Sequence, residues 1–129
     1  MESKDISKSL LQTDAEQFTQ SPPGLYALLE SVRQRPAMYL GHLSLTNFRS
    51  WLYGYQMGKH DAGLPPSDEE KEFYGFDAFV QDKYDWHDVG GWAAKILYYH
   101  RNEHLALEEF FKLLDEFKEL KRKERESDK

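Results

Sequence analysis

The chain contains no cysteine, which excludes disulfide bonds, thiolate catalysis and zinc sites built on cysteine. It also has no apolar run long enough to span a bilayer. The stretch from Met1 to Thr13 lacks the continuous apolar segment of a secretory signal. From these three absences we expect a cytoplasmic protein that does not insert into a membrane.

Phosphate-binding and nucleophilic motifs are missing as well. Gly90-Gly91 fits neither the G-x-G-x-x-G nor the G-x-x-x-x-G-K pattern that cradles phosphate. His87-Asp88 is a His–Asp pair, but no serine stands in a nucleophile-elbow context beside it. The many carboxylates occur in charge runs, where nothing raises the pKa of one of them selectively. We therefore expect no catalytic residue, no cofactor and no enzymatic activity.

One short pattern is compatible with a metal site. His100, Glu103 and His104 satisfy the H-x-x-E-H spacing of a class of zinc peptidases. That chemistry needs both histidines on one continuous helix, together with a third ligand. Asn102 lies inside the pattern and is a plausible helix boundary, so we interpret both histidines as surface residues. A metal-dependent hydrolase remains the remote alternative.

The length and composition predict a single all-α domain. The chain has 129 residues, within the ~100–150 residues common for one domain. Aromatic residues make up 15% of it, so the core should consist largely of Phe, Tyr and Trp. Apolar residues recur at helical spacing, and no alternating segment predicts a strand. We expect a compact bundle of about five helices at 24–34, 45–60, 75–85, 90–101 and 103–122. A flexible arm at 1–21 should precede the domain at 22–122, and a charged, frayed tail should follow at 123–129.

Particular residues define these helices. Ser44 and Asn102 are the expected N-caps of the helices at 45–60 and 103–122. The longest helix should bury a stripe formed by Leu107, Phe110, Leu114 and Phe117, and the helix at 90–101 should turn Trp92, Ile96 and Tyr99 inward. Gly54 and Gly58 each cost up to about 1 kcal/mol in a helix, which predicts a close approach of another helix at that face.

Acidic residues concentrate in one quarter of the chain. The net charge is -6, and residues 61–92 hold nine Asp and Glu against only Lys71 and Lys83. Such a field repels nucleic acid and anionic membranes and attracts basic protein surfaces. We therefore expect a basic protein partner and no nucleic acid.

Aromatic residues are interleaved with these acids, a combination typical of protein interfaces. Asp82, Asp85 and Asp88 would also lie near one face if the helix at 75–85 continued. The predicted partner-binding residues are Glu72, Tyr74, Asp77, Asp82, Asp85, Trp86 and Asp88. The next choice is the exposed side of the second helix, around Arg49, Tyr53 and Gln56.

The most distinctive stretch of the sequence is residues 28–41, which read L-L-E-S-V-R-Q-R-P-A-M-Y-L-G. It resembles the segment near the start of the type II topoisomerase ATPase domain, L-E-x-V-R-x-R-P-G-M-Y-I-G. The residues that bind ATP in that family are missing: there is no asparagine motif on a following helix, no D-x-G-x-G and no glycine-rich lid. The resemblance is therefore structural, and we expect Met38, Tyr39 and Leu40 to fold back as an apolar plug.

A second resemblance covers roughly residues 24–120. It combines the R-P-x-M-Y-L-G segment with Gly54-Tyr55, the helix from Phe76 to Tyr84, Gly91-Trp92 and the segment from Phe111 to Phe117. Together these features resemble small immunity proteins of bacterial polymorphic-toxin and contact-dependent growth-inhibition systems. The resemblance implies a cytoplasmic inhibitor that binds and neutralises one cognate toxin, often a nuclease. The alternative is a non-catalytic adaptor or regulatory subunit that uses the same acidic surface, and the oligomeric state stays open.

Overall fold

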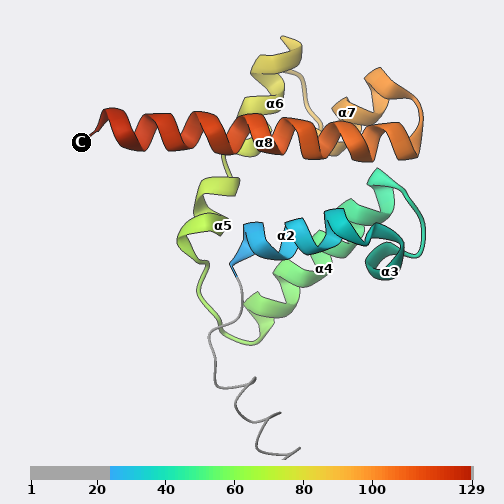
Figure 1. Cartoon of the computed structure of the whole chain (residues 1–129), viewed down its shortest axis with the longest axis horizontal. Coiled ribbons are helices and arrows are strands. Elements are labelled where there is room, and N and C mark those ends of the chain that lie inside the picture. The colour runs from blue at the N-terminus through green and yellow to red at the C-terminus, as the bar shows by residue number, and fades with distance from the viewer. Residues whose placement is uncertain (1–23, 129) are drawn as a thin grey trace, which may run out of the picture.

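The computed structural model describes residues 24–128, which form an all-α structure without any strand (Figure 1). Its helices are α2 (Leu25–Gln34), α3 (Pro36–Leu40), α4 (Leu45–Asp61), α5 (Asp68–Phe73), α6 (Phe76–Tyr84), α7 (Trp92–His100) and α8 (Glu103–Ser127). The predicted all-α bundle is confirmed. The arm predicted at residues 1–21 lies outside the described residues.

The long helix α8 is the spine of the bundle. It packs against α4, α6 and α7, and its length runs across the whole molecule in Figure 1. The predicted stripe of Leu107, Phe110, Leu114 and Phe117 is buried, as expected from its spacing. The helix does not end near residue 122 but continues to Ser127. Arg122 pairs with Glu119 and Glu126 one turn to either side, and such pairs stabilise an exposed helix.

Aromatic rings fill the centre of the core. The ring centroid of Phe110 lies 4.6 Å from that of Phe48 on α4, 4.9 Å from that of Trp92 on α7 and 5.4 Å from that of Phe76 on α6. Tilted and edge-on pairs at these separations are favourable beyond the apolar area that they bury. This cluster therefore joins α4, α6, α7 and α8 at one point.

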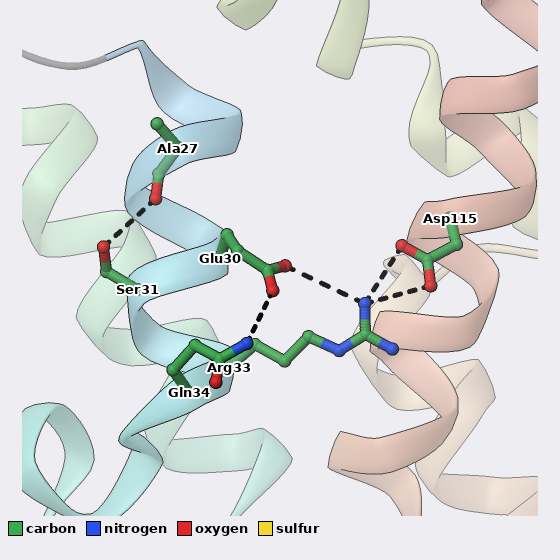
Figure 2. A network of polar contacts seen from close by, with 6 residues as sticks. All are labelled: Ala27, Glu30, Ser31, Arg33, Gln34 and Asp115. Carbon is green, nitrogen blue, oxygen red and sulfur yellow. Dashed lines mark hydrogen bonds and ion pairs between the residues drawn. The ribbon is translucent and has the colours of Figure 1, made fainter.

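Helix α2 is attached to α8 partly through polar contacts at its surface. Arg33 Nη1 donates to both carboxylate oxygens of Asp115, at 3.1 and 2.9 Å, and Glu30 lies on the other side of the guanidinium (Figure 2). The guanidinium carbon is also 5.5 Å from the ring centre of Phe111. Exposed ion pairs contribute at most about 1 kcal/mol. The buried side chains of Leu25, Leu29 and Val32, which belong to the common hydrophobic core, therefore contribute more than this ion pair to holding α2 in the bundle.

Two short helices, α3 and α5, form in addition to the five that were predicted. Pro36 stands at the start of α3, where its missing N–H costs nothing. In α5 the Ser67 side chain accepts a hydrogen bond from the backbone N–H of Glu70, and three acids occupy the first turn, where the helix dipole favours negative charge. The apolar plug predicted on α3 forms only in part. Met38 is 63% exposed, whereas the Tyr39 ring packs edge-on against Trp51.

The predicted close approach at Gly54 and Gly58 is wrong. A Cβ atom added to either glycine would meet no described atom within 4 Å. The reason is the orientation of α4, which buries Leu45, Phe48 and Leu52 and leaves the two glycines on the exposed side. The glycines therefore have no packing role within the described part of the chain.

Candidate protein-binding surface

The acids of residues 70–88 divide into two groups, and the first group is used inside the molecule. Glu70 is buried and forms an ion pair with Lys59, and the hydrogen bond between them raises the pKa of Lys59. Glu72 accepts a hydrogen bond from the Tyr26 hydroxyl at 2.7 Å and pairs with Arg125 of α8. Burial, together with that hydrogen bond, raises the pKa of Tyr26. Glu72, although predicted as a partner contact, therefore serves to fasten α5 to α2 and α8.

Asp77 also has a structural partner. Its Oδ1 accepts a hydrogen bond from the backbone N–H of Trp92 at 2.9 Å. This N–H belongs to the first turn of α7, where no backbone acceptor is available within the helix. Gly91, the residue that precedes the helix, has no side chain to cap it. Asp77 therefore caps α7 from α6 and closes the loop between the two helices.

Asp82, Asp85 and Asp88 form the second group, and they are exposed. His87 Nε2 lies 3.9 Å from a carboxylate oxygen of Asp82 and 3.6 Å from one of Asp85. Across residues 24–128, no lysine or arginine forms an ion pair with any of the three, and the neighbouring Lys83 pairs with Glu116. This part of the surface therefore carries negative charge that is not neutralised within the described structure.

The three acids do not share a helix face, contrary to the pattern suggested by their spacing. Helix α6 ends at Tyr84, and Asp85 takes a left-handed conformation with φ 49°. The backbone N–H of Trp86 then donates back to the carbonyl of Gln81 at 2.9 Å, which ends the helix as in a Schellman motif. His87, in the loop that follows, lies close to both Asp82 and Asp85, and Asp88 is the next residue of that loop.

Aromatic rings adjoin this loop. Trp86 is half-buried, with its ring centroid 5.1 Å from that of Tyr98 and 6.1 Å from that of Tyr99 on α7. The Tyr99 ring stacks on Tyr84 at 4.5 Å, and burial, followed by the charge of Glu109, raises the pKa of Tyr84 to about 12. Tyr99 was expected in the core but is 51% exposed. Lys95, one turn before Tyr99 on α7, is buried instead.

We call this cluster the acidic-aromatic surface. It comprises Asp82, Asp85, Trp86, Asp88, Val89 and Tyr98. Val89 at the tip of the loop is 96% exposed. Val89 and Tyr98 were not predicted, because a single valine between charged and glycine residues, and one of two adjacent tyrosines, carry no periodic signal. Lys95 was not predicted either, although its position directly before Ile96, in an otherwise apolar part of the helix, indicates burial.

Tyr74, the remaining predicted contact, belongs to a different surface. It lines a hollow of about 220 Å³ between α4 and α5 with Tyr53, Met57 and Leu64, all of them exposed. Gln56 lines the same hollow, and Arg49 lies 5.7 Å from the Tyr53 ring centre. This is the side of α4 that was predicted as the second candidate for a partner-binding surface.

The histidines of the H-x-x-E-H pattern do not converge with its glutamate. His100 ends α7 and lies 3.9 Å from Glu109, whereas His104 pairs with Glu108 at 3.2 Å on α8. No group of three residues placed to hold a metal ion occurs within residues 24–128. The pattern spans a helix boundary, which explains why its members point to different partners.

Glu103 of that pattern fastens α8 to the start of α4. Its carboxylate accepts hydrogen bonds from the Ser44 hydroxyl at 3.0 Å and from the Thr46 hydroxyl at 2.6 Å, together with the Thr46 backbone N–H. Partial burial acts to raise the pKa of Glu103, but these hydrogen bonds outweigh it and lower the pKa below its ordinary value.

None of the helices described for residues 24–128 is long and apolar enough to cross a membrane. Comparisons with protein-family models, with curated proteins and with solved structures found no match for this chain.

Proposed function

We propose that this protein is a non-catalytic, cytoplasmic immunity protein that binds a basic toxin domain through its acidic-aromatic surface and neutralises it. The observation that carries the proposal is the set of exposed aspartates, Asp82, Asp85 and Asp88, which have no lysine or arginine partner in residues 24–128 and lie beside Trp86. Unpaired charge next to aromatic rings is the composition expected of a surface that pairs with cations of a partner.

The chemistry of the proposed partner supports this assignment. A nuclease holds phosphates with lysine and arginine, so its active surface is basic. An acidic protein that covers such a surface competes with the nucleic acid directly. Long-range attraction speeds the encounter, whereas desolvated aromatic contacts slow the dissociation. The segments that resemble immunity proteins, at residues 24–120, are consistent with this role.

Association kinetics with a candidate partner test the proposal. Candidate partners are basic toxin domains encoded by neighbouring genes, and the variant is the double reversal Asp82→Lys and Asp85→Lys. We expect association at least ~10-fold slower at low ionic strength, because steering by charge changes rates by 10-fold or more. The difference should shrink as salt is raised, since salt screens charges beyond ~8 Å at physiological strength.

The matched control reverses two acids elsewhere, Glu124→Lys and Glu126→Lys. Both lie near the C-terminal end of α8, which projects away from α7 (Figure 1). The net charge changes equally, so an equal loss of rate in both variants would contradict a localised interface. Binding through the acidic-aromatic surface without inhibition of a toxin activity would instead favour the adaptor function.

A further inference from the structure

Lys95 is a buried cation without a carboxylate partner among the described residues. It lies on the inner side of α7 between Trp92 and Ile96 and is 1% exposed. Its ammonium nitrogen donates to the backbone carbonyl oxygens of Asp88, at 3.0 Å, and Gly90, at 2.6 Å. A buried charge is strongly destabilising unless polar groups surround it. Here the two carbonyl groups supply that environment.

Both carbonyl groups belong to the loop between α6 and α7. The loop begins where the Trp86 N–H donates to Gln81, and it ends where the Trp92 N–H donates to Asp77. Between these two hydrogen bonds, the Lys95 ammonium contacts the backbone of the loop. The ammonium also lies 5.7 Å from the ring centre of Trp86, a distance that allows a cation–π interaction.

The shape of the loop depends on these contacts. Gly90 has φ 126°, which other residues rarely adopt, and its carbonyl is one of the two acceptors of Lys95. Val89, between the two acceptor residues, is almost fully exposed. Collapse of the loop onto α7 would bury this apolar side chain, which is favourable. The contacts to Lys95 oppose that collapse, since they hold the backbone on either side of Val89.

We infer that Lys95 is a positioning residue that holds the loop at 85–91 in a preformed shape, so that Val89, Asp85 and Asp88 are presented as one fixed convex surface. Only the identity of the partner rests on the function proposed above. The matching surface is basic and has a shallow apolar recess that receives Val89. A preformed loop loses little conformational entropy on binding, which favours tight association.

Because the chain contains no cysteine, the ammonium group at position 95 can be removed and then restored chemically. Lys95→Cys introduces the only thiol of the chain. Reaction of the unfolded variant with 2-bromoethylamine gives an S-aminoethyl side chain that restores the ammonium. Reaction with iodoethane gives an S-ethyl side chain that lacks the charge and serves as the matched control. Lys95→Met provides an uncharged variant that needs no chemical step.

The measurement is amide hydrogen exchange of the free protein, with α4 and α8 as internal references. We expect the loop amides of the S-aminoethyl protein to exchange as slowly as those of the wild type. In the S-ethyl protein and in Lys95→Met, the amides of residues 86–92 should exchange at least ~10-fold faster while α4 and α8 stay unchanged, as in local opening. Equal loop protection with and without the charge would overturn the inference. Loss of protection in all helices, or failure of the uncharged proteins to fold, would also overturn it, because Lys95 would then support the whole core rather than the loop.

This experiment needs no partner, so its outcome is independent of the proposed immunity function. If the loop is preformed but the protein binds no basic partner, the inference about Lys95 holds and the proposed immunity function is wrong.

Discussion

The acids of the acidic segment, residues 61–92, do not all have the same role. Glu70 and Glu72 are paired with Lys59, Tyr26 and Arg125, and they connect helices. Further along the segment, Asp82, Asp85 and Asp88 are exposed and lack a lysine or arginine partner among the described residues. A run of acids in the sequence therefore identifies a charged region but not a binding surface. Whether an acid is free to bind a partner depends on whether the fold brings a cation to its carboxylate.

The largest expected effect separates the buried acid from the exposed one. Glu70→Ala leaves the Lys59 ammonium without its carboxylate partner in a largely buried place, so we expect a loss of about 2–3 kcal/mol in the free energy of unfolding. Asp82→Ala, at an exposed position inside α6, should change it by less than about 0.5 kcal/mol. Urea unfolding of both variants measures the difference. Equal losses would mean that the division into internal and exposed acids is wrong.

A smaller effect is expected where an acid caps a helix. Asp77→Ala removes the acceptor of the Trp92 N–H, and the loss of such a cap costs about 1 kcal/mol. Asp82→Ala, one and a half turns further along α6, should have almost no effect on stability. Thermal unfolding of the two variants at neutral pH is the measurement. If Asp82→Ala were as destabilising as Asp77→Ala, the exposed aspartates would have structural contacts of their own.

The smallest effect concerns Glu103, an internal acid outside the segment. Its pKa in the folded chain is below the ordinary value of 4.5. Its contribution to stability is therefore complete above pH ~4.5 and is lost as the pH falls through the lower folded value. Glu103→Gln should thus lower the Tm at pH 7, and the gap to the wild type should narrow at pH 3. Glu108→Gln, on the exposed side of α8, should change the Tm little at either pH, and a constant gap for Glu103→Gln would rule out this linkage.

Much of the fold follows from local pattern. The caps at Ser44 and Asn102 were predicted and are confirmed, because each side chain accepts a backbone N–H three residues ahead. The stripe of α8 is confirmed because its spacing leaves one apolar face. The prediction for Gly54 and Gly58 was wrong. Glycine destabilises a helix, but this loss of stability does not by itself show that another helix packs against the glycine. The end of α8 at Ser127 was missed, because pairs such as Arg122–Glu126 extend a helix without an apolar face.

The candidate surface was predictable only in part. Asp82, Asp85, Trp86 and Asp88 could be named from charge and aromatic content. The internal roles of Glu72 and Asp77 could not, since their partners Tyr26, Arg125 and Trp92 are distant in the sequence. Whether the predicted partner is a toxin stays a prediction that binding experiments decide.

The sequence by itself determined five of the seven described helices, most of their limits, the aromatic core and the place where negative charge accumulates, because these depend on neighbours within a few residues along the chain. The tertiary structure alone decided which acids are neutralised, which aromatic rings are exposed and which cation supports the loop. Lys95 shows the physical reason most clearly. Its charge is compatible with the core only because folding brings the carbonyl groups of Asp88 and Gly90 to its ammonium, and no local pattern specifies that meeting.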